Sequence, residues 1–263
     1  TMLMGSTREL DTRPEIRFEN IVKTFYSENN EKKVIEHIDM SIYKNEFVVI
    51  FGAGQCGKTT LLKLLAGLEK VTDGAIYIDG KKTSGFNPKV GMVYQTTELF
   101  PWLTTMGNVE FGPKARGIKK SERRKKAQYY IDLVGLKGFE KHFPIKLSGG
   151  MRQRVGIARA YANDPEIILM DEPFGHLDAQ TRYMMEEEVE RIWAKEKRTV
   201  LFVTNNVEEA IYLADRIIIL TECPSVVLKE YEIDLPRPRD MVSEEFLALR
   251  EEISTLVDVR MKV

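Results

Sequence analysis

The stretch with the clearest chemical use runs from Gly52 to Thr59 and reads Gly-Ala-Gly-Gln-Cys-Gly-Lys-Thr. It fits the phosphate-loop (P-loop) pattern of glycine, four residues and Gly-Lys-Thr. Backbone N–H groups of such a turn can point inward at a phosphate, and a helix that begins there adds partial positive charge. Lys58 can reach the β- and γ-phosphates, and the Thr59 hydroxyl can hold Mg²⁺. The expected phosphate-binding residues are Gly52, Ala53, Gly54, Gln55, Cys56, Gly57, Lys58, Thr59 and Thr60.

The residues on either side of this loop support phosphate binding. Residues 46–51 form a short apolar run, as expected of a buried parallel strand, and residues 60–65 have a helical pattern. The alternative is a strand-to-helix glycine turn with a chance lysine. Because strand and helix are both in place, phosphate binding is the favoured interpretation.

An acidic pair, Asp171 and Glu172, ends a second apolar run at residues 166–171. Asp171 can hold Mg²⁺, directly or through water. Glu172 can accept a proton from a water molecule that attacks the γ-phosphate. The alternative is a polar strand terminus, which is common alone but improbable beside a P-loop.

A third stretch, Leu-Ser-Gly-Gly-Met at residues 147–151, can form a second anion site. The Ser-Gly-Gly turn can open a helix, so its backbone amides and the Ser148 hydroxyl would converge on an anion. The P-loop already surrounds its own phosphates. The second site, formed by Ser148, Gly149 and Gly150, is therefore expected to close over a nucleotide held by a partner subunit.

Composition bounds the class of protein. The 263 residues suffice for one large domain or two small ones, and the net charge of −1 gives no bulk attraction to nucleic acid. No apolar run approaches the roughly 20 residues that cross a bilayer, and no signal peptide is visible. Cys56 and Cys223 are the only cysteines, which favours a reducing cytoplasm.

Alternating strand and helix patterns predict a mostly parallel sheet with ligands at the carboxyl ends of its strands. The first strands lack intervening helices, so an antiparallel flank is expected. Ser121 is predicted to cap a helix that ends at Leu133, and Asp178 one over residues 179–195. Expected strands are 16–26, 38–42, 75–80, 90–94, 166–171, 199–204, 217–220 and 226–233, with a polar turn at 27–33. The strands at 90–94, 166–171, 199–204 and 217–220 are expected to be buried.

The basic segment at residues 114–126 is interpreted as a solvated helix face. A membrane-surface contact is the alternative. Nucleic-acid binding is disfavoured because no aromatic residues are interspersed in the segment.

The ordered set of P-loop, Gln95, Leu-Ser-Gly-Gly-Met and Asp-Glu pair resembles the nucleotide-binding subunit of an ABC transporter, over residues 16–250. The resemblance implies an α/β P-loop NTPase (RecA-like) fold with an antiparallel β flank and an inserted α-helical subdomain. It also implies an ATP hydrolase with ATP and Mg²⁺ as cofactors, at the cytoplasmic face of the cell membrane. The implied partners are transmembrane permease subunits, a second ATPase subunit in a homo- or heterodimer and, indirectly, a solute-binding protein.

The resemblance divides the chain and assigns further roles. Expected parts are a flexible tail (1–15), an ATPase domain (16–240) with a helical subdomain at about 96–162, and a C-terminal helix (241–263). Gln95 would sense the metal and the γ-phosphate. Phe25, next to Tyr26, would stack on adenine, with a core position as the alternative. Asp178 ends the D-loop (175–178) that crosses the dimer interface. Residues 99–104 resemble the segment that receives a coupling helix, although Trp102 there is also open to ordinary packing.

Three short stretches, 100–102, 171–174 and 234–239, resemble the nitrate, sulfonate and taurine importers, which carry oxidised anions or small organic solutes. The chain departs from the family at Gln55, His176 and Asn205, where glycine, alanine and the switch histidine are usual. Asn205 leaves open a subunit with weak hydrolysis of its own, paired in an asymmetric heterodimer. A soluble ABC ATPase acting on nucleic acid or ribosomes is the other alternative, but neither a second cassette nor a coiled-coil insertion is present.

Overall fold

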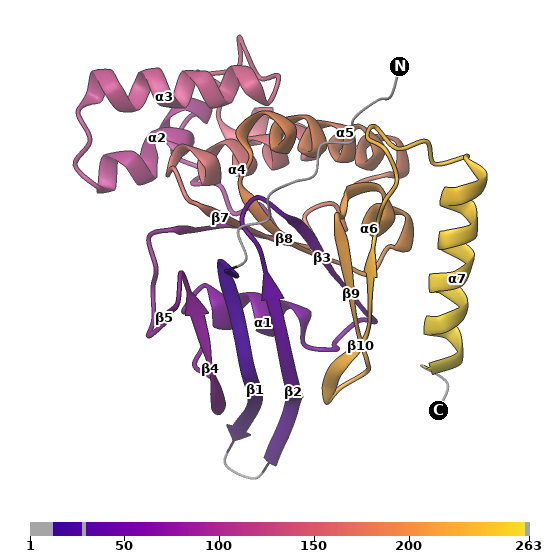
Figure 1. Cartoon of the computed structure of the whole chain (residues 1–263). Coiled ribbons are helices and arrows are strands. Elements are labelled where there is room, and N and C mark those ends of the chain that lie inside the picture. The colour runs from indigo at the N-terminus through magenta and orange to yellow at the C-terminus, as the bar shows by residue number, and fades with distance from the viewer. Residues whose placement is uncertain (1–12, 28–29, 261–263) are drawn as a thin grey trace, which may run out of the picture.

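A computed structural model describes residues 13–27 and 30–260 (Figure 1). Most of the expected N-terminal tail and the last three residues therefore lie outside the described part. The strands are β1 (Ile16–Ser27), β2 (Asn30–Ile42), β3 (Phe47–Phe51), β4 (Asp73–Ile78), β5 (Lys81–Lys82), β6 (Val90–Val93), β7 (Ile167–Asp171), β8 (Thr199–Thr204), β9 (Arg216–Leu220) and β10 (Ser225–Glu232). The α-helices are α1 (Lys58–Leu65), α2 (Thr105–Ala115), α3 (Lys120–Leu133), α4 (Gly149–Ala162), α5 (Ala179–Glu196), α6 (Val207–Leu213) and α7 (Glu244–Arg260).

The strands form one sheet in the order β5-β4-β1-β2-β10-β9-β3-β8-β7-β6. Strands β9, β3, β8, β7 and β6 are parallel, and β1 pairs antiparallel with both β2 and β4. Strand β10 joins the two parts, because it runs parallel to β2 and antiparallel to β9. The predicted parallel sheet with an antiparallel flank is confirmed.

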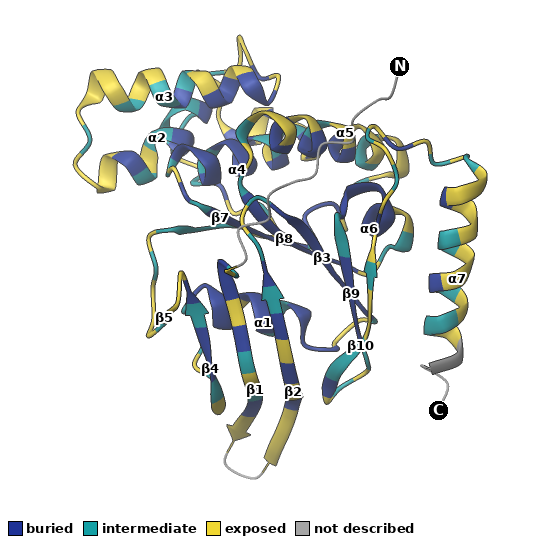
Figure 2. Ribbon diagram, in the orientation of Figure 1, coloured by how far each residue is buried: buried dark blue, intermediate teal, exposed yellow. Residues whose placement is uncertain are grey.

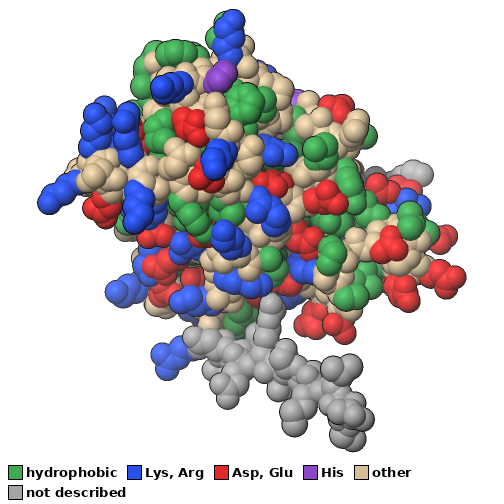
Figure 3. Space-filling view, turned by 90° about the horizontal axis from the view of Figure 1, so that it is seen from above, with side chains coloured by type: hydrophobic (Ala, Val, Ile, Leu, Met, Phe, Trp, Pro, Cys, Tyr) green, Lys and Arg blue, Asp and Glu red, His purple; other side chains and the backbone are tan. Residues whose placement is uncertain are grey.

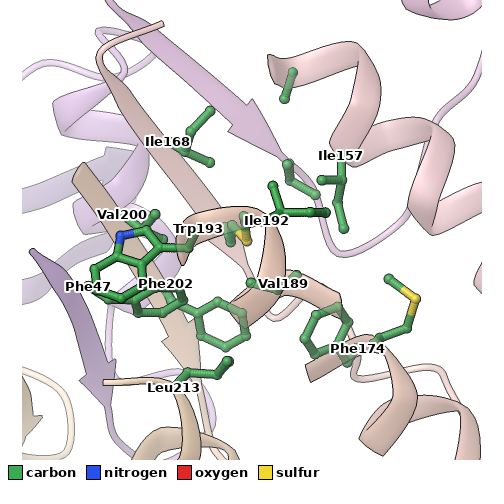
Figure 4. Packing of buried hydrophobic residues seen from close by; sticks show 14 of the residues in the cluster. Phe47, Ile157, Ile168, Phe174, Val189, Ile192, Trp193, Val200, Phe202 and Leu213 are labelled. Atoms are coloured by element: carbon green, nitrogen blue, oxygen red, sulfur yellow. The ribbon is translucent and has the colours of Figure 1, made fainter. Parts of the chain in front are cut away.

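Four of the parallel strands, β3, β7, β8 and β9, are buried on both faces, as their dark blue in Figure 2 shows. Alternate residues of β3 enter different clusters. Phe47 packs with Trp193 of α5 and Phe202 of β8, at ring-centroid distances of 5.8 and 5.9 Å (Figure 4). Val48 and Ile50 instead join the cluster formed with α1. Helix α5 on one face of the sheet and helix α1 on the other thus hold β3 in place.

Three local predictions are wrong. Ser121 does not cap a helix, because the chain is extended at Lys119 and α3 already begins at Lys120. Most of the predicted turn at 27–33 is strand, since Ser27 pairs with Asn30 and backbone ladder bonds need no apolar side chains. Strand β6 is mostly half-buried because it is the outermost strand of the sheet.

The predicted helix cap at Asp178 is confirmed, because Asp178 Oδ1 accepts from the Thr181 N–H at the start of α5. The Ser-Gly-Gly turn does open a helix, α4, and Ser148 Oγ accepts from the Met151 N–H there. Within the described residues, no helix is long and apolar enough to span a membrane. Helices α2, α3 and α4 fall within the segment predicted to be a helical subdomain, whose boundaries remain a prediction.

Candidate functional site

The P-loop joins β3 to α1, and Lys58 is the first residue of that helix. The Lys58 side chain is only 3% exposed. Its ammonium donates to the carbonyl oxygens of Gly52, at 2.9 Å, and Ala53, at 2.7 Å. The buried charge is therefore fixed inside the loop by the loop's own backbone.

Two residues of the loop adopt the left-handed conformation that favours glycine. Gly57 has φ = +92°, and a Cβ there would lie 3.0 Å from Cγ1 of Val34 on β2. Gln55 has φ = +65°. Such a conformation strains a residue with a side chain by roughly 1–2 kcal/mol. Alanine at position 57 would be strained by the positive φ and would crowd Val34, so glycine is required there. Gln55 stands where glycine is usual, although its positive φ strains a residue with a side chain.

The carboxyl ends of the parallel strands β3, β7 and β6 bring the predicted catalytic and metal-binding side chains together, although β8 lies between β3 and β7. Thr59 Oγ1 donates to Asp171 Oδ1 at 2.8 Å, and Lys58 Nζ lies 3.4 Å from Glu172 Oε1. Gln95, which follows β6, donates from Nε2 to Glu172 Oε2 at 3.5 Å. Burial, and then the charge of Glu172, raise the pKa of Asp171. The P-loop, β6 and β7 thus meet at one place.

The donor atoms at this place fit Mg²⁺. Thr59 Oγ1 and Asp171 Oδ1 are neighbouring hard oxygen atoms, the ligand type that Mg²⁺ prefers. A P-loop Ser or Thr and a strand-end Asp hold Mg²⁺ in P-loop NTPases. The two side chains are therefore suited to share one ion with a bound phosphate.

Two cavities adjoin this cluster and share Glu172. One, of about 520 Å³, is lined by Gln95, Asn205, Arg182 and Glu209 among others. The other, of about 330 Å³, is lined by the P-loop residues from Gln55 to Thr60, except Cys56, and by side chains of β2. Asn205 follows β8 directly, and the next residue caps α6. Glu172 therefore lies between the P-loop and the predicted switch residue.

Phe25 and Tyr26 lie near the end of β1 and are 39% and 69% exposed, so neither is a core aromatic. Lys23 Nζ stands 4.4 Å from the centre of the Phe25 ring. Lys23 is itself held by the Glu69 carboxylate and the Lys70 carbonyl. One face of the Phe25 ring thus has a cation against it, and the ring remains available for stacking.

The residues of the predicted second anion site, Ser148, Gly149 and Gly150 (called here the signature), do not join this site within one chain. A Cβ on Gly150 would lie 2.9 Å from Cγ2 of Thr181, next to the D-loop. Among the described residues that line the two cavities, Ser148, Gly149 and Gly150 are absent. The signature is thus presented beside Asp178, away from the P-loop of its own chain.

Several residues near the site were not predicted. Arg182 donates to the Leu177 carbonyl of the D-loop at 3.2 Å and lines the same cavity as Asn205. Burial raises the pKa of Glu209 to about 7 and, together with the charge of Glu209, that of Glu186 to about 8. In the sequence these are ordinary charged residues of helices, and no local pattern distinguishes them.

The basic segment 114–126 lies in the α2–α3 region, where Lys and Arg side chains stand out in Figure 3. Part of it is ion-paired: Arg123 lies 3.2 Å from Glu110, and Lys126 lies 3.1 Å from Asp164. Arg116 donates to the Asn163 carbonyl. These contacts favour the interpretation as a solvated helix face.

Comparison with known proteins adds an independent finding. Residues 35–175 match the family model described as ABC transporter. An uncharacterised ABC transporter ATP-binding protein of Methanocaldococcus jannaschii is 48% identical, over 92% of this chain and 91% of the relative. The nitrate import ATP-binding protein NrtD of Synechocystis is 41% identical, over 89% of this chain and 92% of its own. The aliphatic sulfonates import ATP-binding protein SsuB of Bacillus cereus is 40% identical, over 90% and 94%.

A solved structure agrees with these relatives. It is a dimeric, post-hydrolysis ATP-binding cassette bound to ADP and phosphate. Its TM-score to this chain is 0.73 at 33% sequence identity, with 83% of this chain and 98% of the solved one covered. The predicted resemblance and fold class are confirmed.

Proposed function

This chain belongs to the ABC transporter family, and we propose that it binds and hydrolyses ATP to drive a membrane importer of small oxidised anions or organic solutes. The observation that carries the proposal is the meeting of Lys58, Thr59, Asp171 and Glu172 at the carboxyl ends of β3 and β7. ATP phosphates would lie in the P-loop, with the Lys58 ammonium as their buried counter-charge.

The chain's own residues divide the hydrolysis step between them. Glu172 is placed to accept the proton of the attacking water, and Gln95 holds the Glu172 carboxylate from the side of β6. Thr59 and Asp171 would hold Mg²⁺, which neutralises charge on the β- and γ-phosphates. Asn205 faces the same cavity as Glu172 and would contact the γ-phosphate.

The complete site needs a second ATPase subunit. Ser148, Gly149 and Gly150 form the N-terminus of α4 and line neither cavity beside the P-loop, so they would close over the nucleotide of a partner. Asp178 lies beside them and would belong to the same interface. The solved relative described above is dimeric, which supports this arrangement.

A permease subunit is the proposed membrane partner. An apolar cavity of about 450 Å³ is lined by Phe86, Met92, Tyr94, Phe100 and Phe111. Trp102 is 71% exposed and its ring centre lies 5.6 Å from that of Phe100. An apolar groove with exposed aromatic residues is typical of a helix-docking site. We infer that a coupling helix of the permease docks there, at the cytoplasmic face of the membrane.

The proposed solute class is inferred from the names of relatives, because the solute itself would bind to other subunits of the importer and not to this one. Relatives named for nitrate and aliphatic sulfonates cover about nine-tenths of this chain at 41% and 40% identity. A second possibility, a subunit with weak hydrolysis of its own in an asymmetric pair, is favoured by Asn205 in the cavity with Glu172.

The test is Mg-ATP binding and turnover by the wild type and Lys58→Ala. Removing the ammonium should weaken binding or turnover by roughly 10- to 150-fold, because charge-assisted contacts contribute about 1.5–3 kcal/mol. Lys125→Ala on α3 is the control, since its exposed side chain lies outside the lining of both cavities. Unchanged affinity and unchanged turnover in Lys58→Ala would overturn the proposal.

A further inference from the structure

We infer that Lys32, on β2, is a second cation for the nucleotide phosphates, reaching them from the side opposite to the P-loop floor. The inference rests on the proposed function, because it assigns a further residue to the same ATP site. Lys32 is outside the P-loop, and no motif points to it.

The pairing register of the β1–β2 hairpin turns Lys32 toward the P-loop. Phe25 of β1 pairs with Lys32 of β2. Directly paired residues of antiparallel strands project from the same face of the sheet, with Cβ atoms about 4.5–5.5 Å apart. Val34, two residues along the strand, lines the same cavity as Lys32, although the β1–β2 register shifts between Lys33 and Ile35. Since Val34 meets the P-loop at Gly57, this face of the hairpin is the one turned toward the loop.

The cavity beside the P-loop agrees with the register. Lys32 and Val34 line it together with Gln55, Gly57 and Lys58. Phosphates in the P-loop would therefore have Lys58 beneath them and the Lys32 side chain at the outer rim. The two cations come from different elements, so they approach one anion from different directions.

The neighbouring lysine provides the contrast. Lys33 alternates to the opposite face of β2, and its ammonium lies 2.8 Å from Glu36. Lys32 is exposed, and within residues 13–27 and 30–260 no carboxylate lies in ion-pair range of its ammonium. Two adjacent lysines of one strand thus have different surroundings, and only Lys32 adjoins the phosphate-binding loop.

One face of the β1–β2 hairpin would then contact two different parts of the nucleotide, the base and the phosphates. Phe25 offers its ring for stacking, which accepts any purine, and Lys32 offers charge to the phosphates. Because Lys32 is exposed, its contribution should be modest and should weaken with salt, unlike that of the buried Lys58.

The experiment measures equilibrium binding of Mg-ATP and Mg-ADP to the full chain, wild type and variants, at low and high NaCl. Lys32→Met should weaken both nucleotides about three- to tenfold at low salt, and the difference should shrink at high salt. Lys32→Arg should restore affinity, and Lys33→Met, on the other face, should bind like the wild type. The salt dependence and the arginine rescue are readouts that a structural role of Lys32 in the hairpin would not produce.

The outcomes separate this inference from the proposed function. If Lys58→Ala lowers nucleotide affinity while Lys32→Met binds nucleotide as the wild type does, the inference about Lys32 is overturned. The proposed ATP site at the P-loop is then still supported. If Lys33→Met loses as much affinity as Lys32→Met, the effect belongs to the hairpin and the inference is again overturned. If the wild type binds no nucleotide, the proposed function fails and the inference falls with it.

Discussion

Oε1 of Glu172 lies 3.4 Å from Nζ of Lys58, so the proposed proton acceptor is in ion-pair contact with the proposed phosphate-binding cation. The Lys58 side chain is almost fully buried, while 21% of the Glu172 side chain is exposed, toward the two cavities. A phosphate that binds Lys58 must therefore change the charge around Glu172. This contact connects nucleotide binding with the residue that would begin hydrolysis.

Asn205→His should speed hydrolysis. An imidazole at this position can donate to the γ-phosphate and, when protonated, does so with charge, which makes the bond about twice as strong as a neutral one. A gain of about 1.5–3 kcal/mol at the transition state corresponds to roughly 10- to 150-fold in rate. Steady-state hydrolysis by the isolated chain measures the effect.

The control for this variant is Asn206→His, because Asn206 caps α6 and its replacement tests a general effect on the loop. Full activity of the unmodified chain alone, or no gain from histidine at position 205, would contradict the idea of a slow site paired with a faster one on a partner.

Gly57→Ala and Gly54→Ala should behave differently although both glycines belong to the P-loop. Gly57 has a positive φ and a Cβ there would press on Val34, whereas a Cβ on Gly54 would have nothing within 4 Å. Strain of roughly 1–2 kcal/mol should weaken ATP affinity about 5- to 30-fold in Gly57→Ala only. Binding calorimetry on both variants checks this, and equal losses would show that loop geometry does not set the requirement.

Stability should fall as pH rises from about 4.5 to about 8, and Glu186→Gln should reduce that fall. Burial and the charge of Glu209 raise the pKa of Glu186 to about 8. The folded state therefore keeps a proton that the unfolded state has released, so unfolding is favoured as pH approaches 8. Thermal midpoints of the wild type and the variant should diverge with rising pH. Glu245→Gln, an exposed carboxylate on α7, is the control, and parallel curves for Glu186→Gln and the wild type would refute the buried proton.

The parallel sheet, and the residues that meet at the candidate site, could be predicted from the sequence because their signals are local. The P-loop lies between one strand and one helix, and Ser148 and Asp178 cap helices through bonds to amides three residues away. The same expectation, that a serine before a helical pattern caps the helix, was wrong at Ser121, because α3 already begins at Lys120. A capping residue marks a helix start only where its own backbone is extended, as at Ser148 and Asp178 but not at Ser121.

Long-range pairing could not be predicted. Strand β10 pairs with β2, about 190 residues earlier, at Ser225 and Ile35. Arg239 was noted only within a proline-rich stretch, yet it is 5% exposed and donates to the carbonyls of Ile211, Tyr212 and Ile233. Lys32 likewise depends on the hairpin register. These placements follow from tertiary packing, which leaves no periodic or composition signal.

The most direct test of the account is the molar mass of Glu172→Gln in sedimentation, with and without Mg-ATP. The amide keeps the shape of the side chain but accepts no proton, so ATP should persist and hold two subunits together through P-loop and signature. We predict a mass near that of a dimer only with Mg-ATP, and loss of that dimer when Ser148→Arg is added. A monomer that binds ATP at saturation, with and without its natural partner subunit, would contradict the account.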